Sequence, residues 1–387
     1  MSAVDVERAD FLRDEDLAIF RQSAARFLEA HAPPERLARW DRAGMVEREI
    51  WREAGAAGLL CLAVPPEYGG AGGDFRHEVV FMEEMAKKGV TGFAASLHSA
   101  IVAPYILHYG SEEQKRKWLP KMASGEYVGA IAMTEPGAGS DLQGVRTTAR
   151  GEGNHYLVNG QKTFISNGQL ADLVIVVAKT DPSLGARGTS LIVVETAGTQ
   201  GFHRGRNLDK IGLEAQDTSE LFFDNVRVPT ENLLGPEEGL GFAQLMQQLP
   251  HERLIIGVTG AATIERALDV TLAYVKERKA FGQRIIDFQN TQFKLAECKT
   301  EATVARIFID RLIGLHLEGR LDAATASMAK YWTSELENRI VDTCLQFFGG
   351  YGYKNDYPIA RMYRDSRVQR IYGGANEIMK VLIARTL

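Results

Sequence analysis

The chain contains few cysteines, and none of them belongs to a motif. Its 387 residues include three, Cys61, Cys298 and Cys344, which lie far apart with no CxxC pair. An odd number of widely spaced cysteines argues against a disulfide framework and against a zinc site, so we expect no metal. Free cysteines are typical of a reducing compartment, and we therefore expect a cytoplasmic location.

Long apolar runs and an excess of one charge are also missing. No stretch approaches the ~20 apolar residues that a transmembrane helix needs. The acidic segment at residues 5–16 lacks the basic and apolar regions of a secretory signal. Because 45 basic residues oppose 50 acidic ones, the formal net charge is only −5, which gives no electrostatic footprint for nucleic acid. We expect neither a membrane span nor a nucleic-acid partner.

Internal repeats and low-complexity tracts are absent, and the composition is that of a globular protein. Hydrophobic residues make up 45% of the chain and charged residues 25%. These values exclude a disordered or collagen-like class. A chain of this length exceeds one ordinary core, so we expect two or three folding units.

Residues 1–125 show the periodicity of helices. Apolar residues recur every three or four positions over residues 16–30, and similar patterns follow at 47–57, 75–87 and 94–108. Ser111 followed by Gln114 is the signature of a capping box for one more helix. We therefore expect an N-terminal helical domain at residues 1–125.

After Gly125 the period changes from 3.6 to 2, which favours strands over residues 126–238. Runs rich in valine and isoleucine at 173–178 and 190–195 are typical of buried strands. Asn159-Gly160 lies between two strand-like segments and predicts a tight hairpin, because both residues tolerate positive φ. The middle domain should be a β-sandwich or barrel.

Helical periodicity returns at residue 239 and continues over residues 239–387. Breaks near 281–287, 318–321 and 349–358 leave four long helices, and Asp322 is placed to cap one of them. Four long helices favour a bundle. The predicted fold class is α+β, with an N-terminal helical domain, a middle β-sandwich or barrel domain and a C-terminal four-helix bundle.

The stretch MTEPGAGSD, Met133–Asp141, has the composition of a binding loop. Pro136 and two glycines turn the backbone and leave N–H groups unpaired. Thr134 and Ser140 add hydroxyl groups that suit an electron-rich ring. The same composition is typical of an ordinary surface turn, so this stretch alone leaves both interpretations open.

Further segments, which follow one another in a fixed order along the chain, favour the binding loop over the surface turn. They are KTFISNG at 162–168, QDTSELFFDNVRVP at 216–229, ERKAFGQ at 277–283, MAKYWTSELEN at 328–338, FFGGYGY at 347–353 and RIYGGANEI at 370–378. Together with the loop they resemble the flavin-dependent acyl-CoA dehydrogenase family over essentially the whole chain, and the long-chain branch is the nearest match. Several ordered segments are far more specific than one glycine pattern.

The resemblance implies FAD as the cofactor, because side chains cannot accept hydride and a flavin can. The residues at the family's flavin positions are Met133, Thr134, Ser140, Phe164, Ser166, Gln289, Ala375 and Glu377. The residues at the positions that reach the diphosphate and adenosine end, across a subunit boundary, are Arg278, Phe281, Gln346, Gly349 and Gly350. This implies a homo-oligomer, most simply a tetramer.

Three of these positions depart from the usual family residue. Phe164 replaces tryptophan and keeps the aromatic face, Ser166 replaces threonine and keeps the hydroxyl, and Ala375 removes a hydroxyl contact to the flavin. Taken alone, Phe164 is typical of a strand residue in the core, and Arg278 is typical of a solvated cation at a helix end.

The resemblance implies Glu252 as the catalytic base. In several family members the base follows the tyrosine of an IYxG motif, but this chain has Gly373 there, which carries no proton acceptor. The family's other location corresponds to Glu252 in LPHERL. Because proline costs about 3 kcal/mol inside a helix, Pro250 predicts a first turn or a kink at residues 251–253. Taken alone, Glu252 is typical of a surface glutamate.

The thioester carbonyl must also be polarised. The resemblance implies that the backbone N–H of Gly373 and a ribityl hydroxyl of FAD form an oxyanion hole. Ser140, Arg253 and Gly373 match positions that contact the substrate. Small residues within Gly92–Tyr105 leave room for a long acyl chain.

The implied function is oxidation of a medium-to-long-chain acyl-CoA to the trans-2-enoyl-CoA, a step of β-oxidation type, with an electron-transfer flavoprotein as partner. An acyl-CoA oxidase or a flavin monooxygenase on the same scaffold is one alternative. A non-catalytic acyl-CoA- or flavin-binding protein is another. The exact chain length, the pathway and the electron acceptor stay open at the level of sequence.

Overall fold

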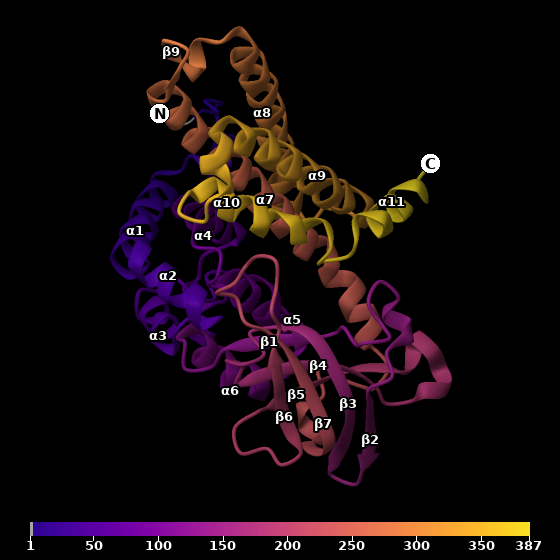
Figure 1. Ribbon diagram of the computed structural model, residues 1–387. Coiled ribbons are helices and arrows are strands. Elements are labelled where there is room, and N and C mark those ends of the chain that lie inside the picture. The colour runs from indigo at the N-terminus through magenta and orange to yellow at the C-terminus, as the bar shows by residue number, and fades with distance from the viewer. Residues whose placement is uncertain (1–2) are drawn as a thin grey trace.

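The computed structural model describes residues 3–387 and places a sheet between two helical regions of the sequence (Figure 1). The first helices are α1 (Glu15–His31), α2 (Pro34–Ala43), α3 (Arg48–Ala56), α4 (Phe75–Lys88), α5 (Ala103–Tyr109) and α6 (Glu112–Ala123). The side chains of Ser111 and Gln114 form the expected capping box at the start of α6. No helix within residues 3–387 is both long and apolar enough to cross a membrane.

The helix expected at residues 94–108 is present as one continuous helical stretch over residues 95–109, and it contains a π-helical turn. A π-helical turn, η3 (Leu97–Val102), precedes α5, and the N–H of Ala103 donates to the carbonyl of His98. Such turns widen a helix locally and often occur at functional sites. This one lies directly before Tyr105, which contacts the candidate base described below.

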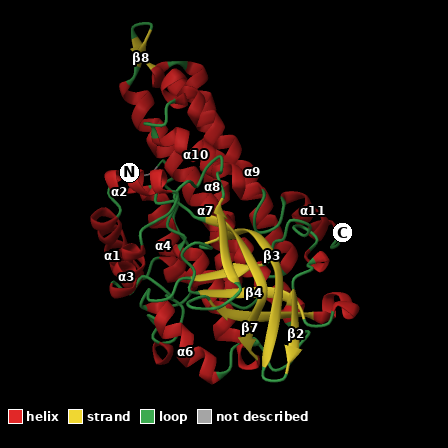
Figure 2. Ribbon diagram, turned by 60° about the horizontal axis from the view of Figure 1, so that its bottom comes forward, coloured by secondary structure: helices red, strands yellow, loops and turns green. Residues whose placement is uncertain are grey.

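The strands of the middle region form one mixed sheet (Figure 2). They are β1 (Gly129–Ala132), β2 (Thr148–Glu152), β3 (His155–Ser166), β4 (Leu173–Lys179), β5 (Thr189–Glu195), β6 (Phe202–Asn207) and β7 (Thr218–Pro229). Their order is β1-β4-β2-β3-β7-β6, with β5 also paired to β4. Only the pairs β1 with β4 and β2 with β4 are parallel.

Strand β4 lies at the centre of the packing, because both of its faces are covered. Leu173, Ile175 and Val177 belong to a cluster shared with α5 and α6. The alternate residues Val174 and Val176 belong to a second cluster on the other face of the sheet. This explains the uninterrupted apolar run that predicted a buried strand.

The prediction of a hairpin at Asn159-Gly160 is wrong. Both residues lie inside β3, and the turn that joins β2 to β3 lies earlier, at residues 153–154. Glycine is required at 160 for a different reason, since a Cβ there would lie 2.4 Å from the hydroxyl oxygen of Thr147. The register with β7 also shifts between Val158 and Gly160, as in a β-bulge.

The C-terminal region contains three long helices and two short ones. They are α7 (Gly241–Glu277), α8 (Gln289–Leu317), α9 (Ala323–Phe348), α10 (Pro358–Ser366) and α11 (Asn376–Ala384). The expected fourth long helix is therefore divided into α10 and α11, which both pack on α9. The side chain of Asp322 caps α9 as predicted, by accepting from the N–H of Thr325.

A two-stranded hairpin, β8 (Lys279–Ala280) and β9 (Gln283–Arg284), follows α7 and projects at one extremity of the molecule (Figures 1 and 2). The opposite half of α7 lies beside the sheet, so this helix links the two ends of the molecule.

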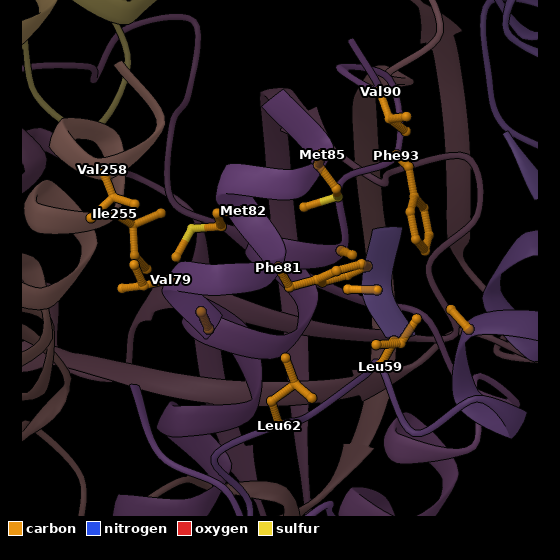
Figure 3. Packing of buried hydrophobic residues seen from close by; sticks show 14 of the residues in the cluster. Leu59, Leu62, Val79, Phe81, Met82, Met85, Val90, Phe93, Ile255 and Val258 are labelled. Carbon is orange, nitrogen blue, oxygen red and sulfur yellow. The ribbon is translucent and has the colours of Figure 1, made fainter. Parts of the chain in front are cut away.

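Pro250 does not begin or end a helix. Helix α7 runs without interruption from Gly241 to Glu277, so the first-turn alternative for residues 251–253 is wrong, and the kink stays a prediction. Proline lacks an N–H and removes one helical hydrogen bond. Contacts from neighbouring helices hold this part of α7 in place, and they include Val79 and Met82 of α4 near Ile255 and Val258 of α7 (Figure 3).

Candidate functional site

Glu252 lies in the interior of the protein and not on its surface. Its side chain is 6% exposed, and its Oε1 atom accepts a hydrogen bond of 2.8 Å from the hydroxyl of Tyr105. Burial raises the pKa of Glu252 to about 7, against the opposing effects of Tyr105 and Arg253. A carboxyl group with such a pKa can accept a proton near neutral pH, which a general base must do.

His251, the residue before Glu252, contacts the same segment that carries Tyr105. The Nε2 atom of His251 donates to the carbonyl of Ala100 at 2.8 Å, and its Nδ1 atom lies 3.1 Å from Nε2 of His316. Ala100 belongs to the π-helical turn and Tyr105 to α5. Two consecutive residues of α7 are therefore held from one neighbouring segment, which the sequence did not reveal.

Arg253 is directed into the interface between α7 and α9. Its Nη1 atom donates to the hydroxyl of Ser327 at 3.3 Å, and the side chain is buried. Within residues 3–387 its Nε atom is buried without a hydrogen-bond partner. Its assignment as a contact to CoA stays a prediction.

Gly373 occupies a position that favours glycine. Its φ is +63°, in the left-handed region, and a Cβ there would lie 2.3 Å from Cδ1 of Ile256 on α7. Ile256 lies one helical turn after Glu252, so Gly373 and Glu252 lie near the same stretch of α7. Within residues 3–387 the N–H of Gly373 has no hydrogen-bond partner and is available to an oxyanion.

The segment after Gly373 is fixed by α9. The ammonium of Lys330 donates to the carbonyl of Gly374 at 2.6 Å and to Oδ1 of Asn376 at 2.8 Å. Ala375 is the residue before α11 and gives that helix no side-chain cap, while Glu377 is exposed in its first turn. Neither Ala375 nor Glu377 has a contact that assigns it to the flavin, so both stay predictions.

A buried ion pair anchors the loop at Met133–Asp141. The ammonium of Lys162 donates to Oε1 of Glu135 at 2.8 Å and to the carbonyl of Met133 at 3.1 Å. Burial acts to raise the pKa of Glu135, but Lys162 and the other donors hold it below its usual range. The backbone turns tightly between Glu135 and Ala138, and Ser140 is exposed. No local pattern predicts this pair, because its members are far apart in the chain.

Phe164 is the unusual residue of β3. It has a φ of +58°, lies where the register with β7 shifts, and is 65% exposed. The interpretation of Phe164 as a core residue is therefore wrong. A bulge next to a functional site commonly redirects a side chain, and here it presents an aromatic ring to solvent.

The neighbours of Phe164 connect it to the binding loop. The N–H of Thr163 donates to the carbonyl of Thr134 at 3.0 Å. The hydroxyl of Ser166 accepts from Nε2 of Gln216 at 3.1 Å. The structure thus places Thr134 beside the end of β3 that carries Phe164 and Ser166, and a shared ligand stays a prediction.

A second group of predicted residues lies at the far end of α7. Arg278, Gln346, Gly349 and Gly350 line a groove of about 440 Å³. The guanidinium of Arg278 lies 5.4 Å from the ring centre of Tyr351, an arrangement that orients a cation. Planar guanidinium groups suit phosphate oxygens, and the assignment of this groove to the diphosphate and adenosine of a flavin stays a prediction.

Phe281 and Gln289 lie beside this groove in sequence but face solvent. Phe281 is 96% exposed at the turn of the projecting hairpin, where its φ is +51°. Gln289 is exposed at the start of α8. The assignment of Phe281 and Gln289 to a cofactor on a neighbouring subunit stays a prediction.

Glu252 and the groove of Arg278 are widely separated along α7. Glu252 lies within this uninterrupted helix and Arg278 directly follows its last residue, so the two lie about 39 Å apart along the helix axis. A role of the groove for a molecule bound to a second copy of the chain stays a prediction.

Comparisons with known proteins identify the family of this chain. Three family profiles match in order: "Acyl-CoA dehydrogenase, N-terminal domain" over residues 14–126, "middle domain" over 130–226 and "C-terminal domain" over 239–387. The long-chain specific acyl-CoA dehydrogenase of Sus scrofa mitochondria is 52% identical over 371 residues, which cover 95% of this chain and 86% of the relative.

Solved structures give the same assignment. An acyl-CoA dehydrogenase from Geobacillus kaustophilus superposes with a TM-score of 0.94 at 49% identity, covering 96% of this chain and 98% of the other. A glutaryl-CoA dehydrogenase from Mycobacterium smegmatis in complex with FADH2 gives a TM-score of 0.91 at 28% identity, with 100% and 97% covered. The chain therefore belongs to the acyl-CoA dehydrogenase family of FAD-dependent oxidoreductases.

Proposed function

We propose that this protein oxidises a medium-to-long-chain acyl-CoA to the trans-2-enoyl-CoA, with Glu252 as the base that removes the α-proton. The observation that carries the proposal is the buried carboxyl of Glu252, whose pKa burial raises to about 7. Gly373, the family's other base position, has no side chain that could act.

The residues present fit FAD at the places that the family uses. Exposed Phe164 and the hydroxyls of Thr134 and Ser166 would line the ring, together with Met133 and Ser140 on the adjoining loop. When bound, the flavin supplies the hydride acceptor for the β-carbon. The diphosphate and adenosine of a flavin on another subunit would meet Arg278, Gln346, Gly349 and Gly350.

The chain's own groups would act together on the substrate. The N–H of Gly373, which is not used within residues 3–387, would donate to the thioester carbonyl and stabilise negative charge there. A carbonyl polarised in this way makes the α-proton more acidic. Glu252 would then take that proton on a carboxylate oxygen. Ser140 would contact CoA, and Arg253 is a weaker candidate for such a contact.

The preference for longer chains rests on small side chains near Glu252. Ala94, Ala95 and Ala100 are buried before α5, in the segment that packs beside the start of α7. Each methylene of substrate that becomes buried adds up to about 0.8 kcal/mol of binding free energy. The similarity to a long-chain specific relative supports the same preference.

We further propose a homotetramer in the cytoplasm that passes electrons to an electron-transfer flavoprotein. The exposed Phe281 and the distance along α7 between Glu252 and Arg278 support an oligomer. The number of subunits, the compartment and the acceptor rest on the resemblance and on composition alone.

Anaerobic mixing of the FAD-loaded protein with acyl-CoA thioesters tests the proposal. We expect the flavin absorbance to bleach, with a higher kcat/KM for octanoyl-CoA and palmitoyl-CoA than for butyryl-CoA. A preference for butyryl-CoA or short branched thioesters would overturn the chain-length part. The absence of bleaching with every thioester would favour a binding protein, and rapid reoxidation in air would favour an oxidase or monooxygenase.

A further inference from the structure

Tyr105 is the direct hydrogen-bond partner of the candidate base. It is fully buried on α5, and its hydroxyl lies 2.8 Å from Oε1 of Glu252. Within residues 3–387, Tyr105 is the only side chain that hydrogen-bonds to the Glu252 carboxyl group, and Oε2 receives no bond. A phenol that donates to one oxygen leaves the other with its lone pairs free.

We propose that Tyr105 is a positioning residue for the reaction: its hydroxyl holds Oε1 of Glu252 and leaves Oε2 as the oxygen that takes the α-proton. The inference rests on the proposed function of Glu252 and adds a second residue to it. In that step the α-proton would pass to Oε2, and the electron pair of the broken C–H bond would form the double bond between the α- and β-carbons. The bound flavin would supply the acceptor for the hydride that the β-carbon loses.

The backbone around Tyr105 keeps the hydroxyl in place. The π-helical turn before α5 carries the carbonyl of Ala100, which accepts from Nε2 of His251 at 2.8 Å. The segment from Ala100 to Tyr105 thus contacts His251 and Glu252 of α7, which directly follow Pro250. Pro250 removes one helical hydrogen bond, so the backbone of α7 is less restrained at this point. The two contacts restrain it there.

Tyr105 is the main polar neighbour of the Glu252 carboxyl group, because the other charged and titratable groups nearby bond elsewhere or are neutral. Arg253 follows it on α7, but its guanidinium donates to Ser327 on α9. Burial lowers the pKa of His251 to about 3, so this ring is neutral at physiological pH, as is its partner His316, whose pKa burial also lowers. Tyr109 of α5 donates to Gln247 at 2.9 Å and not to Glu252.

The phenol can act as a donor across the whole working range of pH. Burial and the nearby Glu252 raise the pKa of Tyr105 well above its usual value, so it stays protonated. A hydrogen bond to a carboxylate favours its charged form and lowers its pKa. Removing the hydroxyl should therefore raise the pKa of Glu252.

The test compares Tyr105→Phe with Tyr156→Phe in the FAD-loaded protein. Tyr156 is also buried and donates to a glutamate, Glu238, at the same 2.8 Å, but it lies in the middle region. We expect Tyr105→Phe to shift the midpoint of the pH profile of anaerobic flavin reduction upward by about one unit. The rate should fall about fivefold near pH 7 and approach the wild-type rate at high pH, while Tyr156→Phe keeps the wild-type profile.

A second readout does not depend on activity. The carboxylic C=O band of Glu252, assigned by its loss in Glu252→Gln, can be followed against pH by infrared difference spectroscopy. Its titration should move upward in Tyr105→Phe and stay unchanged in Tyr156→Phe. If Tyr105→Phe does not retain FAD, Tyr105→Met, which fills the space without a hydroxyl, is measured in its place.

The outcomes separate this inference from the function on which it rests. If the wild-type protein is not reduced by any acyl-CoA, the proposed function fails. If the wild-type protein is reduced and Tyr105→Phe shows an unshifted profile and an unshifted carboxyl band, the positioning role of Tyr105 is overturned while the function stands. A uniform loss of rate at every pH also overturns it, since that result indicates a general packing defect.

Discussion

A Cβ atom on Gly373 would lie 2.3 Å from Cδ1 of Ile256, closer than side-chain atoms can approach. Ile256 follows Glu252 by one turn of α7. The helix that carries the candidate base therefore also occupies the space that a side chain at the family's other base position would need. A side chain at 373 therefore requires Ile256 to adopt another rotamer.

The first prediction moves the base between these locations. In Glu252→Gln with Gly373→Glu, the new side chain meets Ile256 and has a φ of +63°, so we expect poor activity and a loss of about 1–3 kcal/mol of stability. Adding Ile256→Ala removes the colliding atom and should restore part of the anaerobic flavin reduction. Ile256→Ala alone is the control, and failure of the triple variant to exceed the double variant would contradict the steric account.

The second prediction concerns the groove at the far end of α7. Arg278→Ala should weaken FAD retention and subunit association together, because a ligand that binds only the assembled protein stabilises it. Arg320→Ala removes an exposed arginine that pairs only with Glu318 and should change neither property. Analytical ultracentrifugation with flavin quantification measures both. A monomer that keeps stoichiometric FAD would contradict the account.

The third prediction concerns stability against pH. The pKa of Glu252 is about 7 in the folded protein, above the ordinary 4.5 of a glutamate in the unfolded chain. Stability is therefore lost as pH rises from about 4.5 to about 7, because only the folded state holds the proton there. Glu252→Gln should be more stable than wild type by about 3 kcal/mol at about pH 8 and equal to it near pH 4. Thermal unfolding at both values measures this, and a constant difference would contradict it.

The fourth prediction concerns the ion pair beneath the binding loop. Lys162→Met leaves the Glu135 carboxylate buried without its cation, which typically costs 3–5 kcal/mol. Because Lys162 also bonds to the carbonyl of Met133, FAD retention should fall with stability. Lys294→Met breaks an exposed pair with Glu297 and should cost less than about 1 kcal/mol. Equal effects of the two variants would contradict the role of the buried pair.

The sequence predicted features that depend on local pattern. The apolar run at β4, the capping box of Ser111 and the cap by Asp322 are all present, because each depends on residues close in the chain. The prediction at Asn159-Gly160 failed because the long pairing of β3 with β7 overrides the local turn preference.

The candidate site, too, could be predicted from the sequence only in part. Ordered motifs indicated Glu252, Gly373 and Arg278, but the contact of Tyr105 with Glu252 joins residues distant in the chain. The exposure of Phe164 arises from a bulge that depends on register with another strand. Pro250 indicated a first turn or a kink, yet α7 continues through this residue, where it packs against neighbouring helices.

The most direct test of Glu252 as the base is stopped-flow reduction of the flavin by acyl-CoA, under anaerobic conditions, in Glu252→Gln. Glutamine keeps the size and can still accept from Tyr105, so the variant should fold, bind FAD and bind acyl-CoA. We predict that the reduction rate falls by about 100- to 10,000-fold, and that the wild-type rate falls as pH drops below about 7. Near-normal flavin reduction in Glu252→Gln would contradict the assignment and move the search to another carboxylate near the flavin.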